Sequence, residues 1–245
     1  MTPMERLVNQ RETRREGERQ HLAQRRSEIR QREGEAKSAE SLQREVLARI
    51  DSDVLKSIEK RHGDWIPPER LRSVRESAPT ALPREQYETL LRKQSGIPRD
   101  EAHRVLGHYD PQSDEVYVTP NYPVTRQILA HERLHQLSDP QATSALGRGL
   151  EEGVTEWLAR DATGDPHFAD QPRVYPREVR IVDMLEALVG EQALKRAYFQ
   201  GDSQELRRRV SGQLGEGALA KIVHLADENR YGEVETFIHR NYEDR

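Results

Sequence analysis

The stretch that decides the fold is HERLH, from His131 to His135, inside the segment 123–138, which reads PVTRQILAHERLHQLS. On a helix, residues four apart lie about 5–6 Å from each other on one face. Two imidazoles at that spacing can converge on one metal ion with bonds of about 2.0–2.1 Å. Glu132 would then lie near the open position of the ion, where it can exchange a proton with a bound water. The pattern predicts a helical metal site, and its plain alternative is a surface helix with two solvated histidines.

A second element follows one loop later, in the segment 149–158, which reads GLEEGVTEWL. Its apolar residues form one stripe of a helix, and Glu152 and Glu156 fall together on the opposite face. Two carboxylates on one face repel each other unless a cation or a donor lies between them. We therefore expect Glu152 to be a third metal ligand and Glu156 to accept a hydrogen bond from a ligand histidine. Two alternatives stay open: a solvated acidic face, and Glu151 as the ligand.

Together the two elements resemble the gluzincins, zinc peptidases in which HExxH is followed by a helix reading Glu-x-x-Ser/Thr-Asp/Glu. The segment 152–156 (EGVTE) fits that pattern. It is also similar to NEG(L/V)TEY(L)A segments of bacterial metallopeptidase and toxin-type peptidase domains, with Glu151 where Asn is frequent and Trp157 where Tyr is frequent. The resemblance covers about residues 103–200, including a Gly-x-Tyr-Asp hairpin from Gly107.

Carried over position by position, the resemblance implies a role for each motif residue. His131, His135 and Glu152 would bind Zn²⁺, Glu132 would be the general base and acid, and Glu156 would orient His131. Only 16 residues separate His135 from Glu152. This short connection implies a compact zincin-like domain rather than a close relative of the secreted thermolysins.

The rest of the chain predicts an α+β fold that is predominantly helical. Short β-branched and aromatic stretches at 103–109 and 115–119 flank turn residues, which favours a small β-hairpin before the active-site helix. Further helices are expected at 148–161, 176–189, 191–200, 203–211 and 216–240. We expect two parts: a charged helical N-terminal segment over 1–78 and a zincin-like metallopeptidase domain over 79–245.

Between Val8 and Leu22 the N-terminal segment has no large apolar side chain. The run from Glu12 to Arg32 is rich in Arg, Glu and Gln, and its charges alternate in sign along an expected helix. This is typical of a solvated helix or linker, and a helix that binds a partner protein is the alternative. From Leu42 to about Gly63 an i,i+4 apolar pattern predicts an amphipathic helix.

Composition excludes several classes of protein. The chain has no cysteine, which rules out a disulfide scaffold and a cysteine zinc knuckle. Its net charge of −4 argues against a nucleic-acid partner, and no apolar run is long enough for a membrane span. No secretory signal is visible at the N-terminus. We therefore expect synthesis in the cytoplasm, with export, if any, by a route without a classical signal peptide.

Two further features of a peptidase site are expected. An oxyanion needs a second electrophile, for which Tyr175 is the first candidate and His167 a weaker one. A peptide substrate needs an edge strand to which it can add, and the strand ending in Tyr117 and Val118 is the expected place.

Three functions compete at this stage. The first is a zinc-dependent peptidase that hydrolyses peptide bonds, and its resemblance to toxin-type peptidases suggests delivery to a target as a bacterial effector or toxin module. The second is a cytoplasmic regulatory or housekeeping metalloprotease. The third is a non-catalytic helical adaptor with a structural metal. Structural zinc sites are usually closed by four ligands that include cysteine. Three ligands and no cysteine therefore favour catalysis on a protein or peptide.

Overall fold

The structure is a computed structural model that describes residues 24–25, 41–94, 97–102, 104–119, 125–164 and 175–243. By its internal contacts the chain divides into two units, Met1–Val46 and Leu47–Arg245. The candidate site lies wholly in the second unit, and the description below concerns that unit.

A three-stranded sheet forms the smaller part of the fold, in the order β1-β3-β2. The strands are β1 (Thr80–Ala81), β2 (Gly107–Asp110) and β3 (Glu115–Val118). β2 and β3 are the expected hairpin, because Gly107 pairs with Val118 and Asp110 with Glu115 in antiparallel register. β1, which the sequence did not predict, pairs with β3 in parallel on its other side. β3 is therefore the central strand.

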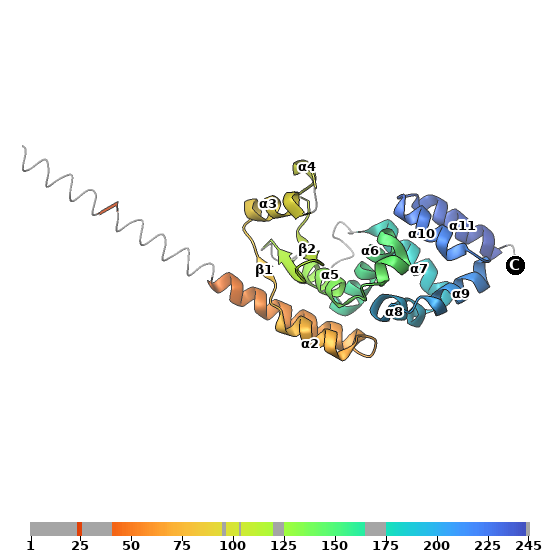
Figure 1. The fold of residues 1–245 in the computed structure, drawn as a ribbon, viewed down its shortest axis with the longest axis horizontal. Helices are drawn as coiled ribbons and strands as arrows, with labels where there is room; N and C mark the ends of the chain where they lie inside the picture. Colours follow the sequence, from red (N-terminus) through yellow and green to blue (C-terminus); the bar gives the residue numbers. More distant parts are fainter. Residues whose placement is uncertain are drawn as a thin grey trace, which may run out of the picture. The chain divides into compact units, whose positions relative to one another are not determined.

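Helices make up most of the chain, as the sequence predicted (Figure 1). One helix covers residues 41–62. The others are α2 (Pro68–Glu76), α3 (Arg84–Gln94), α4 (Arg99–Ala102), α5 (Thr125–Leu137), α6 (Ala142–Thr163), α7 (Pro176–Val189), α8 (Glu191–Gln200), α9 (Gln204–Leu214), α10 (Ala218–Asp227) and α11 (Tyr231–Glu243). α5 contacts β2 and β3, and α6 contacts α5, α7, α8 and α10. Among the described residues, no helix is long and apolar enough to cross a membrane.

The long helix α6 is broken at Gly147, which has φ +68° and ψ 165°. Only glycine fits there, for two reasons. Its backbone has a positive φ, and a Cβ at this position would lie 2.6 Å from Asp227 Oδ2. Asp227 also accepts a hydrogen bond from the backbone N–H of Gly149 at 3.0 Å, as a capping carboxylate does. A new helical segment thus begins at Arg148, and Glu151 and Glu152 lie near its start.

From Leu47 onward, the helix at 41–62 is part of the core of the second unit. Leu47, Val54, Leu55 and Ile58 are buried members of the main hydrophobic cluster. The compact unit therefore begins at Leu47, whereas the expected domain began at residue 79. The boundary lies here because the i,i+4 apolar side chains of the helix are buried in the core of this unit.

His62 is a buried histidine at the end of that helix, and it makes the fold sensitive to acid. Its Nε2–H donates to the carbonyl of Leu158 at 3.1 Å, and Nδ1 has no partner among the described residues. Burial and the charge of Lys195 lower its pKa, and the carboxylates of Asp161 and Glu191 oppose them only in part. Protonating Nδ1 would create a buried charge with no acceptor.

We expect the free energy of unfolding to fall as pH drops below about 6.5, because the unfolded histidine binds a proton more readily than the folded one. His62→Gln keeps an N–H donor but cannot titrate, so its stability should decline less between pH 7 and pH 5. Urea unfolding of both proteins at several pH values measures the difference. Equal declines would show that other groups cause the acid sensitivity.

Candidate metal centre

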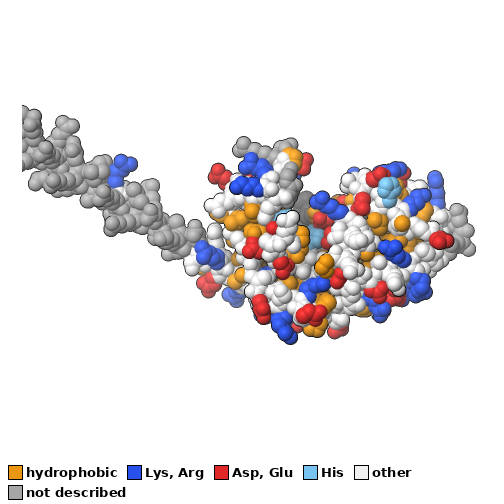
Figure 2. Space-filling model, in the orientation of Figure 1, with side chains coloured by type: hydrophobic (Ala, Val, Ile, Leu, Met, Phe, Trp, Pro, Cys, Tyr) orange, Lys and Arg blue, Asp and Glu red, His pale blue; other side chains and the backbone are white. Residues whose placement is uncertain are grey.

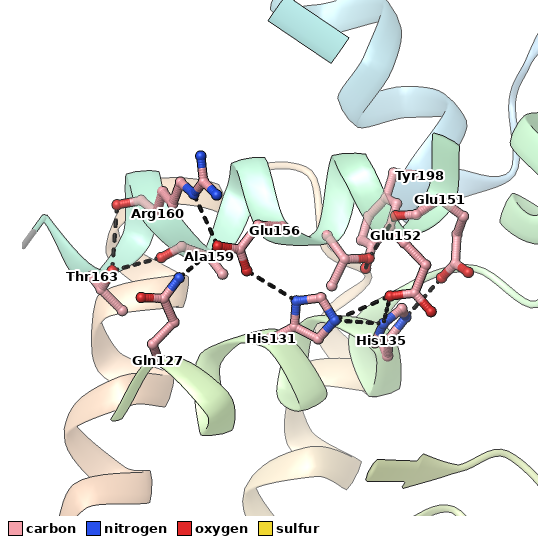
Figure 3. Close-up of polar contacts among 11 residues, drawn as sticks. Gln127, His131, His135, Glu151, Glu152, Glu156, Ala159, Arg160, Thr163 and Tyr198 are labelled. Atoms are coloured by element: carbon pink, nitrogen blue, oxygen red, sulfur yellow. Dashed lines mark hydrogen bonds and ion pairs between the residues drawn. The ribbon is translucent and has the colours of Figure 1, made fainter. Parts of the chain in front are cut away.

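The candidate site lies between α5 and the second segment of α6, which run antiparallel (Figure 3). His131 faces Glu156, and His135, one turn later on α5, faces Glu151 and Glu152, one turn earlier on α6. The i,i+4 spacing of the histidines and that of the carboxylates therefore match across the helix pair.

Three potential ligand atoms converge in the middle of this pair. Nε2 of His131 lies 3.1 Å from Nε2 of His135. Oε2 of Glu152 lies 3.2 Å from the first of these nitrogens and 3.3 Å from the second. The edges of a tetrahedral site with bonds of about 2.0–2.1 Å are about 3.3–3.4 Å long. The three side chains thus have the spacing needed to hold one metal ion.

The proton positions favour a cation at the same point. Nδ1 of His131 lies 3.2 Å from Oε2 of Glu156, and Nδ1 of His135 lies 2.8 Å from Oε1 of Glu151. Ionised carboxylates only accept hydrogen bonds, so both Nδ1 atoms carry the proton. Neutral imidazoles would then turn two Nε2 lone pairs toward the Glu152 oxygen, and three acceptors would face each other without a donor. A metal ion removes that repulsion.

The carboxylates behind the histidines are themselves held in place. Oε1 of Glu156 accepts from Gln127 Nε2 at 2.6 Å and from Arg160 Nε at 2.9 Å. On the other side, Thr155 donates to the backbone carbonyl of Glu151 at 2.8 Å, and its hydroxyl lies 2.7 Å from that of Tyr198. The carboxylate that orients His131 thus has its own donors, and Thr155 bonds the backbone that carries Glu151.

Without a metal ion, protons on the two histidines supply the positive charge at this point. Burial lowers the pKa of His131, but hydrogen bonds to Glu152 and Glu156 outweigh it and raise the pKa to about 9. Glu151 and Glu152 likewise raise the pKa of His135 against its burial. Burial raises the pKa of Glu152, but hydrogen bonds from the two histidines prevail and hold it well below its usual range. The site is built to concentrate positive charge between these groups.

Glu132 lies beside the histidines, buried, and it lines the same cavity. Burial raises its pKa, although His131 and His135 oppose that shift. The backbone of β2 approaches it closely, because a Cβ on Gly107 would lie 2.9 Å from Glu132 Oε1. Glycine at this position leaves room for the carboxylate next to the strand.

Tyr175 stacks on His131, with ring centroids 5.4 Å apart and an angle of 8° between the rings. It precedes α7 in a left-handed backbone conformation, φ 52° and ψ 47°, which is costly for a bulky residue. Burial raises the pKa of its phenol, and the charges of Glu152 and Glu132 raise it further. Tyr175 is thus a protonated hydroxyl held at the site by a strained backbone.

A cavity of about 500 Å³ opens onto the site, and its lining includes Glu132, Tyr175 and the three potential ligands. Figure 2 shows a hollow on this face, between the sheet and the C-terminal helices, with histidine and carboxylate colours in it. The volume of the cavity lies within the range of small-molecule binding pockets.

The expected substrate edge at Tyr117 and Val118 is wrong. Both residues lie in β3, where Tyr117 pairs with Thr80 of β1 and with His108 of β2, and Val118 is fully buried. A strand paired on both sides cannot accept a peptide. β1 could not be predicted from the sequence, because two residues are too few to show a strand pattern. β2 is the strand whose residues line the cavity.

Three contributions to the site were missed from the sequence. Glu151 is placed behind His135 as its hydrogen-bond acceptor, while Glu152 lies at the convergence point. His108 of β2 lines the cavity as well. Arg148 lines it too, and only the break at Gly147 brings it there. His167, the weaker electrophile candidate, lies outside the described residues.

No protein-family model, curated protein sequence or solved structure matches this chain. The interpretation of the site therefore rests on its own geometry.

The supporting carboxylates should matter almost as much as the ligands. Glu151→Gln and Glu156→Gln should each lower metal affinity about 10- to 100-fold, because each loses the charged acceptor that fixes a histidine ring. Glu152→Ala should lose more, since it removes a ligand atom. Competition with a chromogenic chelator measures all three.

Glu216→Gln is the matched control, because Glu216 is exposed and does not line the cavity. If Glu152→Ala binds metal as wild type does while Glu151→Ala does not, the assignment of the two carboxylates is reversed.

Proposed function

We propose that this protein is a zinc-dependent peptidase with a compact zincin-like domain. The observation that carries the proposal is the triangle of His131 Nε2, His135 Nε2 and Glu152 Oε2, with edges of 3.1–3.3 Å, on a cavity that also contains a buried carboxylate. Imidazole nitrogens and one carboxylate are a ligand set of catalytic zinc.

An open metal position separates catalysis from a structural role. The described residues supply three converging ligands, and the chain has no cysteine to complete a closed structural site. The cavity gives solvent and substrate access to the fourth side. A helical adaptor with a structural metal would need neither an open position nor a buried carboxylate beside it.

Glu132 is the general base and acid in this proposal. When bound, a zinc ion would polarise the scissile carbonyl and make an attacking water more acidic. Glu132 takes the proton from that water and returns it to the leaving amine. Burial raises its pKa, and a carboxylate with a raised pKa is a better proton acceptor than an ordinary one.

Tyr175 is the side chain that donates a hydrogen bond to the oxyanion. Its phenol stays protonated because of its raised pKa, and stacking on His131 holds the ring beside the ligands. A donor fixed before the reaction loses no energy in reorganisation, which is how such groups stabilise a developing negative charge.

The substrate is a protein or peptide that adds to β2. Gly107, His108 and Tyr109 of that strand all line the cavity. An extended peptide along this edge would form main-chain hydrogen bonds and bring a carbonyl past Glu132. This edge replaces the one expected at Tyr117 and Val118.

The direct test uses the full chain loaded with one equivalent of zinc and a peptide mixture derived from a digested proteome. Mass spectrometry should find new termini that are absent from a metal-free sample and reappear when zinc is restored. Stoichiometric zinc binding without any cleavage would favour the adaptor with a structural metal. Failure to bind zinc would contradict the proposal, because His131, His135 and Glu152 would then not form a zinc site.

A further inference from the structure

Arg148 is a cation at the border of the candidate site. It is the first residue after the break in α6, is exposed, and precedes Glu152 by one turn on the same helix. It lines the 500 Å³ cavity and also a neighbouring pocket of about 350 Å³. Glu152 and Tyr175 border both spaces, so Arg148 lies where the site opens toward the C-terminal helices.

Its guanidinium has no ion pair or hydrogen bond within the described parts of the chain, whereas other arginines near the site do. Arg133 is bound to Asp51, and Arg160 is bound to Glu156. Among the described residues that line the 500 Å³ cavity, Arg148 is the one arginine or lysine. Its five N–H donors are therefore available to a ligand in that cavity.

Two other carboxylates that line the smaller pocket, Asp227 and Glu178, interact with other groups. Asp227 accepts from the backbone N–H of Gly149 at 3.0 Å, which caps the helix. Burial raises the pKa of the Tyr231 phenol, and the interaction of that phenol with Glu178 raises it further. Both carboxylates line the pocket with Arg148, and within the described part of the chain neither is ion-paired with it. The guanidinium of Arg148 thus lies in a pocket whose carboxylates Asp227 and Glu178 interact with other groups.

We propose that Arg148 determines substrate specificity by binding a carboxylate close to the scissile bond, an inference that rests on the proposed peptidase function. A guanidinium binds a carboxylate through two parallel hydrogen bonds, which gives orientation as well as affinity. Arg148 precedes the ligand Glu152 by four residues, about 6 Å along the helix, which is the length of about two residues of an extended peptide. The carboxylate therefore belongs to a residue within about two positions of the cleaved bond.

Such a carboxylate comes either from an Asp or Glu side chain or from the C-terminus of a short peptide. Cleavage of a peptide library by the zinc-loaded protein separates these sources. Peptides with Glu near the cleaved bond should be cut about tenfold faster than the same peptides with Gln, and amidation of the C-terminus tests the second source. Arg148→Ala should bring the Glu-to-Gln ratio close to one, and Arg148→Glu should favour Lys and Arg instead. Arg207→Ala is the matched control, an exposed arginine away from the cavity.

A binding measurement gives a readout that does not depend on turnover. Succinic monohydroxamate, which has a free carboxylate, should bind wild type more tightly than its amide analogue, and Arg148→Ala should abolish that difference. If wild type cuts peptides without preference for a carboxylate, or if the preference survives in Arg148→Ala, the role of Arg148 is overturned while the peptidase stands. If no peptide is cut and neither hydroxamate binds, both proposals fail.

Discussion

Glu132→Gln should lower the rate of peptide cleavage by about 10²- to 10⁴-fold while the protein keeps its fold and its zinc. Glutamine has nearly the same shape as glutamate but cannot accept and return a proton, and proton transfer by a positioned group contributes about this much. The ligand atoms of His131, His135 and Glu152 are left in place. Cleavage of a fluorogenic peptide measures the rate, and elemental analysis measures the zinc.

Glu132→Asp is the informative companion, because it keeps the carboxylate on a shorter side chain and should retain more activity than Glu132→Gln. Full activity in Glu132→Gln would exclude Glu132 from proton transfer. Loss of zinc together with activity would instead make it a residue that supports the metal centre.

The same variant addresses the cellular role that the sequence suggests. If the protein is an effector delivered to a target cell, wild type made in that cell should impair growth and Glu132→Gln should not. A housekeeping protease would give equal growth with both. Equal toxicity of both would place the harmful activity outside the peptide-bond chemistry, as the adaptor hypothesis requires.

The helical half of the site could be predicted because its chemistry is local. His131 and His135 share a helix face by their spacing alone, and so do Glu152 and Glu156. The same spacing favoured Glu152 as the third ligand and left Glu151 as the alternative, so spacing alone did not settle the choice. It depends on the register of α6 against α5, which the break at Gly147 sets by packing against Asp227.

The pairing of strands far apart in the sequence could not be predicted from any local sequence pattern. β1 is a two-residue strand that joins β3 in parallel, and only the finished sheet shows that β3 is central. The helix expected over 216–240 is in fact α10 and α11, because Asn229 adopts a left-handed conformation, φ 59°, between them. Asparagine tolerates that conformation better than most residues, but its presence alone does not require it.

Arg133, the central residue of the HERLH stretch, ties the site to the N-terminal helix. It is fully buried, and Nε and Nη2 each donate to a carboxylate oxygen of Asp51 at 2.7 Å. Nη2 also donates to the carbonyl of Ser77 at 2.7 Å. A guanidinium buried beside the metal ligands is therefore neutralised by a residue from the helix at 41–62.

A chain that starts at residue 79 should consequently fail to fold, whereas one that starts at Ser41 should fold and bind zinc like the full chain. Leaving Arg133 buried without its partner costs about 3–5 kcal/mol. Each large apolar side chain lost from the core, such as Leu55 or Ile58, costs about 1.5–3 kcal/mol more. Domains are stable by only about 5–15 kcal/mol, so these losses together exceed what the fold can tolerate. Circular dichroism and thermal unfolding of the two truncations provide the comparison.

Asp51→Asn isolates the ionic part of this effect within the full chain, and it should lower the free energy of unfolding by about 3–5 kcal/mol. The double variant Asp51→Leu with Arg133→Met should recover much of that loss, because an apolar pair of similar volume leaves no buried charge. Recovery would show that the cost lies in the unpaired guanidinium rather than in the lost packing of Asp51. A stable, zinc-binding protein starting at residue 79 would contradict this account and restore the boundary expected from the sequence.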